Sequence, residues 1–378
     1  MSPPQRLRIL MTADAVGGVW SYATTLARGL CRRGHRVHVV TLGPAPRQDQ
    51  IRAAENVHGL TLETTDLALE WIDPEGHDLG RTAGRLRSIA QRVEPDVIHL
   101  NGYREALSEW DIPVLVAAHS CVRSWWRAAR NEEPWEQRWL VYMDNVRTGL
   151  DAADAWVAPT AAFRNELSRL YAPRHAGHVI WNGLEPRLPS AHKESFILAA
   201  GRLWDEAKNV GILARIASRV PWPVEIAGPL SDGQRAVGIP TSNIVLFGEM
   251  SREALADEMA RAEIFVAPAV YEPFGLSVLE AAASGCALVV SDIDSFRELW
   301  EGAALFVDPR DASALGAALT HLTRNTPLRQ EMQARARRRA RRYSAAAMAR
   351  AYEALYAELQ GNTSSSRPAA VQLVEVSP

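Results

Sequence analysis

Short apolar runs alternate with longer amphipathic stretches along the first half of the chain. An apolar run at 7–13 precedes a stretch, 20–33, whose apolar positions recur at helical spacing. Apolar runs of this length are typical of strands buried on both faces of a parallel sheet. Similar runs follow at 36–42, 97–100, 114–118, 155–158 and 178–180. The pattern predicts a parallel sheet with helices on both faces.

A second alternation of the same kind begins after a polar stretch that is rich in Gly and Pro. This stretch, 182–194, contains Gly183, Pro186 and Pro189, and it predicts an interdomain linker. Beyond it the pattern predicts a helix at 210–219 and strands at 196–200, 224–227, 244–247, 264–270 and 287–291. Apolar residues at helical spacing after Tyr343 predict a packed terminal helix.

The length of 378 residues favours two domains over one. We predict an α/β protein with two Rossmann-like, doubly wound domains that face a cleft. The predicted parts are a first domain at 1–185, a second domain at 186–345, a terminal helix at 346–360 and a disordered tail at 361–378. Two such domains place a ligand cleft between the carboxyl ends of their sheets.

Composition narrows the range of partners. The formal net charge of −2 provides no global field for nucleic acid. Three widely spaced cysteines argue against a disulfide scaffold and fit a reducing cytoplasm. No leader-like segment and no apolar run of the ~20 residues that a membrane span needs are visible. Arginines gathered at 335–342 indicate a solvated helix face or a patch for lipid phosphates, so peripheral contact with the inner membrane face stays open.

The most informative segment is 264–281, IFVAPAVYEPFGLSVLEA. A predicted strand leads through a short loop with Glu272 to Gly275, which opens a helix that contains Glu280. The free backbone N–H groups of a first helical turn, together with the helix dipole, bind phosphate. We therefore expect a diphosphate on these amides, between two carboxylates that accept hydroxyl hydrogen bonds.

Two cations in the segment AAGRLWDEAKN suit the same ligand. Arg202 offers planar, bidentate donors, and Lys208 adds a compact positive charge. Both would stabilise a diphosphate leaving group as its negative charge grows. Solvent-exposed loop cations are the alternative interpretation of this segment alone.

Residues of the first half complete the predicted site. Gly17-Gly18 follows the first strand without forming a GxGxxG fingerprint, so the pair indicates a lip that closes on a ligand and not a dinucleotide site. His119 ends a predicted strand and can point into the cleft. Trp125 and Trp126 begin an aromatic run that either packs a helix or stacks against an acceptor.

A possible metal pair is the sequence Asp292-Ile293-Asp294. Because it follows a buried-looking strand, we expect these carboxylates to cap a loop and not to chelate a metal. We expect no metal and no other cofactor to be required.

Together these motifs resemble glycosyltransferase family 4, the retaining enzymes of the GT-B fold. The hallmark of that family is two glutamates separated by seven residues, and here it reads EPFGLSVLEA from Glu272 to Ala281. Supporting matches extend over about 7–360. They include Gly17-Gly18, His119, Asn182-Gly183, Arg202, Lys208, Phe247-Gly248, Gly285, Ser291-Asp292, Arg297-Glu298 and Val307-Asp308-Pro309.

The resemblance implies that 1–185 is the acceptor-side domain, that 186–345 is the donor domain, and that the terminal helix at 346–360 crosses back to the first domain. It also implies a role for each matching residue. Glu272 would bind hydroxyls of the donor sugar, and Glu280 would bind the ribose. Backbone amides at Phe274, Gly275 and Leu276, with Arg202 and Lys208, would hold the diphosphate. Gly248 to Met250 would contact the base, His119 would lie near the transferred sugar, and Gly18 would approach the phosphates. Many members carry a carboxylate after the histidine, where this chain has Ser120.

The reaction implied is transfer of a hexosyl unit from a nucleoside diphosphate sugar to a hydroxyl group, with retained configuration. The acceptor is a glycan, a lipid-linked glycan or a small molecule. Three alternatives remain open: a GT-B-like sugar-nucleotide epimerase, an inverting transferase, and a non-catalytic regulator that binds nucleotide sugars.

Overall fold

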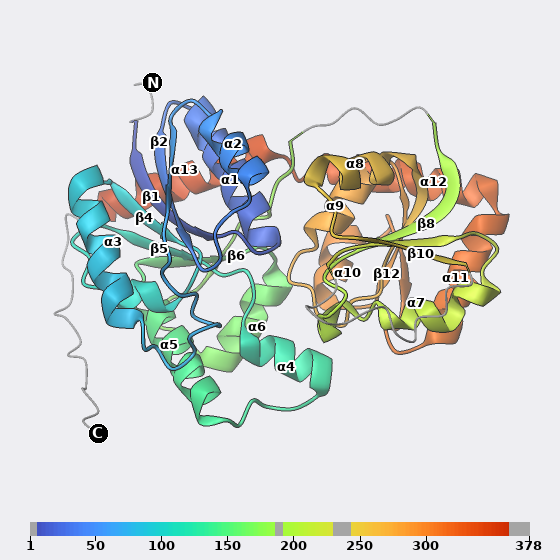
Figure 1. The fold of residues 1–378 in the computed structure, drawn as a ribbon, viewed down its shortest axis with the longest axis horizontal. Coiled ribbons are helices and arrows are strands. Elements are labelled where there is room, and N and C mark those ends of the chain that lie inside the picture. The colour runs from blue at the N-terminus through green and yellow to red at the C-terminus, as the bar shows by residue number, and fades with distance from the viewer. Residues whose placement is uncertain (1–5, 186–191, 230–242, 363–378) are drawn as a thin grey trace.

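The chain folds into two α/β units that lie side by side (Figure 1). The computed structural model describes residues 6–185, 192–229 and 243–362. The first unit, blue to green in Figure 1, contains a seven-stranded sheet, and the second, yellow to red, contains a six-stranded sheet. Every strand pair in both sheets is parallel.

The first sheet has the strand order β3-β2-β1-β4-β5-β6-β7. Its strands are β1 (Arg8–Asp14), β2 (Arg36–Leu42), β3 (Leu60–Thr64), β4 (Val97–Leu100), β5 (Val114–Ala117), β6 (Ala155–Ala158) and β7 (His178–Val179). The connecting helices are α1 (Gly18–Arg32), α2 (Gln48–Glu55), α3 (Leu79–Val93), η1 (Arg104–Leu107), α4 (Val122–Arg130), α5 (Gln137–Ala152) and α6 (Ala161–Tyr171). The order in which strands are added to the sheet reverses between β1 and β4, and open α/β sheets bind ligands at such a point.

The second sheet repeats this topology, with the order β10-β9-β8-β11-β12-β13. Its strands are β8 (Glu194–Ala200), β9 (Val224–Ala227), β10 (Ile244–Gly248), β11 (Ala262–Ala267), β12 (Ala287–Ser291) and β13 (Leu305–Val307). Its helices are η2 (Glu206–Lys208), α7 (Gly211–Ile216), η3 (Ala217–Arg219), α8 (Arg252–Arg261), α9 (Leu276–Ala283), α10 (Asp294–Trp300), α11 (Ala312–Arg324) and α12 (Thr326–Ala340). Apolar side chains cover both faces of each sheet and form separate cores.

The last helix, α13 (Ala345–Asn362), returns to the first unit. Met348, Tyr352 and Tyr356 are buried there in the same core as α1 and β1. Gly29 of α1 allows the close approach, because an added Cβ would lie 2.9 Å from the Cβ of Ala349. Residues 363–378, most of the segment expected as a disordered tail, lie outside the described part of the chain.

Most predicted strands agree with the structure to within two residues, and five agree at both ends. Two predictions extended three residues too far. The strand expected at 264–270 ends at Ala267, and Val270 donates its N–H to the carbonyl of Ala207 in η2 (2.9 Å). The helix expected at 210–219 is α7 followed by the 3-10 turn η3.

The arginines of α12 and of the turn after it are partly engaged with the protein. Arg339 donates to the carbonyls of Leu299 and Glu301, and Arg335 pairs with Glu331. Within the described ranges, no helix has the length and the apolar character that crossing a bilayer requires.

Candidate active site

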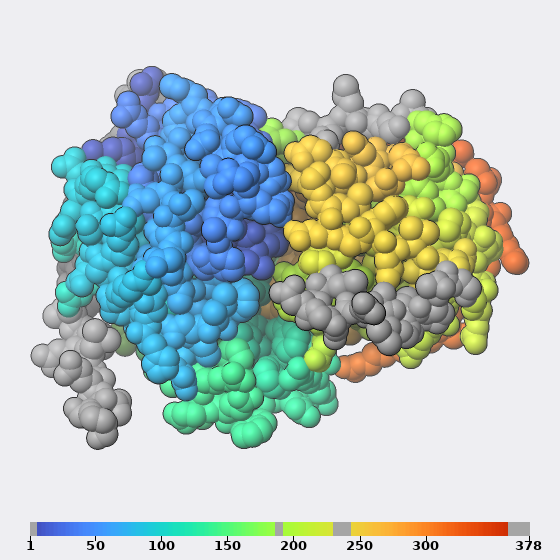
Figure 2. Space-filling model, in the orientation of Figure 1, coloured from blue at the N-terminus to red at the C-terminus, as the bar shows by residue number. Residues whose placement is uncertain are grey.

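A cleft of about 1480 Å³ lies between the carboxyl ends of the two sheets. Both units line it, and Figure 2 shows them as adjoining lobes. Ligand pockets for single small molecules usually measure ~300–1,000 Å³, so the cleft has room for two substrates. Of the residues predicted for the site, all except Gly248 line this cleft. They are Gly18, His119, Trp125, Trp126, Arg202, Lys208, Met250, Glu272, Phe274, Gly275, Leu276 and Glu280.

The loop before α9 presents backbone N–H groups to the cleft. Gly275 caps α9 with a φ of 85°, a left-handed conformation that favours glycine. An added Cβ would also lie 2.8 Å from the ring of Phe296. The Phe274 side chain is buried in the core below, so only its backbone is available to a ligand. The loop is held from both sides, since Ser295 donates to the carbonyl of Glu272 and Thr160 of the first unit donates to that of Pro273.

The two glutamates have different surroundings. The Glu272 carboxylate accepts a hydrogen bond from Nζ of Lys208 at 2.5 Å, and both side chains are mostly buried. Glu280 lies within α9, and its Oε1 is 3.4 Å from Nη2 of Arg252 on α8. Glu272 therefore lies in the loop before α9 and is paired with a cation, whereas Glu280 faces α8.

Arg202 is oriented by a contact that also joins the two units. Its Nη2 donates to Oδ2 of Asp205 at 2.6 Å, and the other oxygen of Asp205 accepts from Nε1 of Trp125 at 2.9 Å. The positive charge of Arg202 helps to hold the pKa of Asp205 below its usual value, against the effect of burial. Trp125 thus contacts the donor side of the cleft directly, which an acceptor-only role does not require. Asp205 lies between Arg202 and Lys208 in the sequence, but no motif there marks it as a site residue.

The glycine pair after β1, Gly17-Gly18, lies next to Arg202 and next to the first turn of α9, the two parts of the predicted phosphate site. An added Cβ on Gly17, which has a φ of 81°, would lie 2.9 Å from Nη1 of Arg202. A Cβ on Gly18 would lie 3.6 Å from Cδ1 of Leu276, in the first turn of α9. The pair allows the first unit to approach the predicted diphosphate position.

His119 lies in the cleft wall as a neutral imidazole. Its Nε2 is 2.7 Å from Oδ1 of Asn101, whose amide nitrogen donates to the carbonyl of Thr12. Since Oδ1 only accepts, Nε2 carries the proton and Nδ1 is an acceptor. Its ring also contacts Tyr22 edge to face, with centroids 4.4 Å apart. Burial lowers the pKa of His119 to about 3, so the neutral ring can contact a ligand through hydrogen bonds and not through a charge.

Asp14 is a second titratable group in this wall. It ends β1, accepts a hydrogen bond from the N–H of Val16 at 2.8 Å and lines the cleft. Burial raises its pKa to about 6, although the Val16 bond and the nearby charge of Arg202 oppose the shift. Asp14 was not predicted from the sequence, because nothing in its local pattern sets it apart from any polar residue at the end of a strand.

The segment predicted to contact the base follows β10. Met250 lines the cleft beside Glu249, which pairs with Arg47 of the first unit at 3.2 Å. Gly248 has a φ of 71°, and its carbonyl accepts from the N–H of Gly228. That carbonyl is therefore already engaged within the second unit.

Trp125, Trp126 and Trp139 form one connected wall of the cleft. The ring centroids of Trp125 and Trp126 are 6.0 Å apart, and those of Trp126 and Trp139 are 6.1 Å apart. Arg130 stacks over Trp126 and pairs with Glu206 of the second unit at 2.7 Å. Nε1 of Trp126 and Nε1 of Trp139 are both buried and have no hydrogen-bond partner within the described part of the chain.

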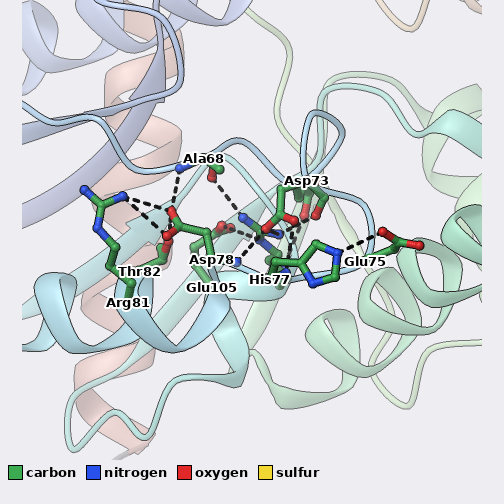
Figure 3. A network of polar contacts seen from close by, with 10 residues as sticks. Ala68, Asp73, Glu75, His77, Asp78, Arg81, Thr82 and Glu105 are labelled. Atoms are coloured by element: carbon green, nitrogen blue, oxygen red, sulfur yellow. Dashed lines mark hydrogen bonds and ion pairs between the residues drawn. The ribbon is translucent and has the colours of Figure 1, made fainter. Parts of the chain in front are cut away.

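A network of polar contacts in the first unit includes Ala68, Asp73 and Glu105 (Figure 3). Arg104, which is fully buried, donates to Asp73, to the carbonyl of Ala68 and to Oε1 of Glu105. Glu70 accepts from the backbone N–H groups of Tyr103 and Arg104 at 2.9 and 3.1 Å. Both Glu70 and Glu105 line the cleft. No sequence motif marks them, and only the fold brings them together.

The Asp292-Ile293-Asp294 segment is engaged with the protein. Both oxygens of Asp292 accept from Arg297, at 2.6 and 2.7 Å, and Asp294 begins α10. The residues that the structure describes contain no group of three or more metal-ligating side chains. The expected independence from metals remains a prediction.

Comparison with known proteins identifies the family. A sequence model of glycosyltransferase family 4 matches residues 16–188, and a model of group 1 glycosyl transferases matches residues 194–325. The chain is 32% identical to a phosphatidyl-myo-inositol mannosyltransferase of Mycobacterium leprae, over 87% of this chain and 90% of that protein. It is 27% identical to a glycogen synthase of Mycobacterium tuberculosis, over 88% and 89% of the two chains.

Solved structures give the same answer for the fold. Sucrose-phosphate synthase from Thermosynechococcus elongatus aligns with a TM-score of 0.77 at 17% identity, covering 94% of this chain and all of that one. Anabaena HepE, in complex with UDP and glucose, aligns with a TM-score of 0.73 at 16% identity, over 93% and 100% of the two chains. The expected GT-B fold is confirmed, and the chain belongs to glycosyltransferase family 4.

Proposed function

We propose that this glycosyltransferase moves a hexosyl unit from a nucleoside diphosphate sugar to a hydroxyl acceptor and retains the anomeric configuration. The observation that carries the proposal is the set of groups around one cleft. Arg202, Lys208 and the amides before α9 adjoin Glu272, and Glu280 lies further along that helix. The neighbour HepE, solved with UDP and glucose, supports a donor of this class.

In the proposed complex the diphosphate lies on the amides of Gly275 and Leu276. The helix dipole of α9 and the two cations then offset the charge that grows on the leaving group. Glu272 takes hydroxyls of the transferred sugar, and Glu280 takes the ribose. No divalent cation is needed in this arrangement, because the protein itself supplies the positive charge.

The acceptor hydroxyl attacks from the side of the first unit. Neutral His119 holds a hydroxyl of the transferred sugar through its acceptor nitrogen. The leaving diphosphate oxygen takes the proton of the acceptor hydroxyl as the glycosidic bond breaks. Attack and departure on the same face retain the configuration, and no second catalytic carboxylate is required.

A ligand screen followed by product analysis tests the proposal. UDP, GDP and ADP and their glucose and mannose conjugates are screened by thermal shift, since a ligand at 100 times its Kd adds ~2.7 kcal/mol of stability. The best donor is then incubated with acceptors, and the anomeric configuration of the product is read by NMR. An inverted product, or interconversion of free nucleotide sugars, would reject the proposal in favour of an inverting enzyme or an epimerase. Donor binding without transfer or slow donor hydrolysis would instead identify a regulator.

A further inference from the structure

The cleft wall of the first unit contains three buried polar atoms without a protein partner. They are Oε2 of Glu105, Nε1 of Trp126 and Nε1 of Trp139, as judged over the residues that the structure describes. All three residues line the cleft. Buried polar atoms are almost always hydrogen-bonded, because leaving one unsatisfied costs ~1–3 kcal/mol. One acceptor and two donors on the same cleft wall therefore point to a ligand with hydroxyl groups.

Contacts within the first unit link these atoms into one surface. Trp139 packs against Tyr142 with ring centroids 6.1 Å apart. Burial, and to a lesser extent the charge of the nearby Glu70, raise the pKa of Tyr142. Helix α5, which carries Trp139 and Tyr142, touches the start of η1 at Gly149. An added Cβ there would lie 2.2 Å from the carbonyl oxygen of Tyr103.

Gly102 leaves space for the two carboxylates at the end of this surface. An added Cβ on Gly102 would lie 2.6 Å from Oε2 of Glu105 and 3.7 Å from Cδ of Glu70. Burial, and then the neighbouring Glu105, raise the pKa of Glu70 to about 8, so at neutral pH Glu70 holds a proton that it can donate. The pair thus offers both a donor and an acceptor to hydroxyl groups.

The charge of this surface argues against an anionic acceptor. Arg104 is bonded to Asp73 and Glu105, and its charge also faces Glu70, so one cation meets three carboxyl groups. Arg130 and Arg138, which line the same wall, pair with Glu206 and Glu136. A phosphate placed here would meet the carboxyl group of Glu105 and cations that already have carboxylate partners, so its charge would gain little compensation, which selects against an anionic partner.

We propose that Glu105, Glu70 and the indoles of Trp126 and Trp139 form an acceptor subsite that selects neutral polyols, such as unphosphorylated sugars, over phosphorylated ones. The indole faces cover the apolar C–H face of the ring, and the carboxyl groups and indole N–H groups bind its hydroxyls. The inference rests on the proposed transferase function, but the binding step does not need turnover.

Binding is measured first, without a donor. Maltotriose is titrated in the millimolar range against the full-length protein, with tryptophan fluorescence as the readout. Two matched pairs are titrated in parallel: glucose against glucose 6-phosphate, and myo-inositol against its monophosphate. We expect the neutral member of each pair to bind at least ~10-fold more tightly. Equal or tighter binding of the phosphorylated members would overturn the proposal.

Variants then test the residues. Glu105→Gln keeps an oxygen for Arg104 but replaces the unpartnered Oε2 by an amide nitrogen, so we expect at least ~10-fold weaker binding of maltotriose. Asp73→Asn is the matched control, because Asp73 bonds the same Arg104 without lining the cleft. It should leave maltotriose binding within about twofold. Equal losses in both variants would mean that Glu105 acts only through the network and would overturn the proposal.

Kinetic assays distinguish a failure of the acceptor subsite from a failure of the proposed transferase function. With the best nucleotide-sugar donor, Glu105→Gln should raise the acceptor KM by a similar factor and leave the donor KM and donor hydrolysis unchanged. If wild-type protein binds maltotriose but no nucleotide sugar, the proposed function fails and the polyol subsite stands. If donors bind and maltotriose and the neutral members of both pairs do not, the subsite fails alone.

Discussion

Replacing each hallmark glutamate by glutamine should separate catalysis from donor binding. Glu272 contacts Lys208 at 2.5 Å in a mostly buried pair, so its carboxylate acts in a medium where charges interact strongly. Its contacts with the transferred sugar should strengthen as the ring gains positive charge. Glu272→Gln should therefore lower kcat by ~10²-fold or more, the range for lost transition-state electrostatics.

Glu280→Gln should behave differently, because its proposed partner, the ribose, does not change during the reaction. Loss of a charged hydrogen bond costs ~1–3 kcal/mol, which corresponds to a rise in donor KM of about 5- to 150-fold with a smaller change in kcat. The 3.4 Å contact with Arg252 is long and adds little to this figure.

The assay measures initial rates over a range of donor concentrations at saturating acceptor. Glu253→Gln is the control, since Glu253 is an exposed carboxylate that lines the same cleft on α8. It should change neither kcat nor the donor KM by more than about twofold. Circular dichroism melting checks that the variants are folded. If Glu280→Gln lowers kcat while Glu272→Gln raises only the donor KM, the placement of the donor is reversed and the reasoning is refuted.

Three further predictions use the same assay or simple unfolding. Activity should survive EDTA, and a loss that Mg²⁺ or Mn²⁺ restores would contradict a protein-supplied counter-charge. Trp125→Phe should raise the donor KM by ~3- to 10-fold, because it removes the 2.9 Å hydrogen bond to Asp205, which orients Arg202. Trp135→Phe is the control, because the Trp135 side chain is largely exposed. A rise in the acceptor KM alone would contradict this role of Trp125. Asp14→Asn should raise the free energy of unfolding, measured in urea, by at most ~3 kcal/mol at pH 7.5 and ~1 kcal/mol at pH 4.5. The reason is that the pKa of Asp14 is raised from 3.8 to about 6, so its ionisation destabilises the folded protein increasingly as the pH rises. An equal gain at both pH values would contradict this prediction.

The strands were predictable where burial on both faces leaves an uninterrupted apolar run. β4, β6 and β12 are fully buried, and their predicted ends agree with the structure. β3 was missed because its five residues are half-buried or exposed at the edge of the sheet, and β13 because it has only three residues. The strand order was not predictable from local pattern, since it depends on which apolar faces meet.

The residues of the candidate site likewise include some that a short stretch of sequence predicts and others that only the fold brings together. Glu272, Gly275 and Glu280 lie within one short segment, so their spacing along a loop and helix could be read directly. Glu70 and Glu105 are far apart in sequence, and each follows a different part of the sheet edge. Their burial and their raised pKa values arise only when η1 and the loop after β3 pack together. A single sequence contains no local signal for such a pair.

The ion pairs in the donor half of the cleft suggest how the site distinguishes its ligand from simple anions. Arg202 and Lys208 each have a carboxylate partner, Asp205 and Glu272, at 2.6 and 2.5 Å. An inorganic phosphate that takes Lys208 would leave the mostly buried Glu272 without its cation, which costs free energy. In the proposed complex a nucleotide sugar would avoid this cost, because its diphosphate would engage Lys208 while its sugar hydroxyls bind the Glu272 carboxylate. The pair is therefore expected to favour a molecule that carries phosphate and hydroxyl groups together.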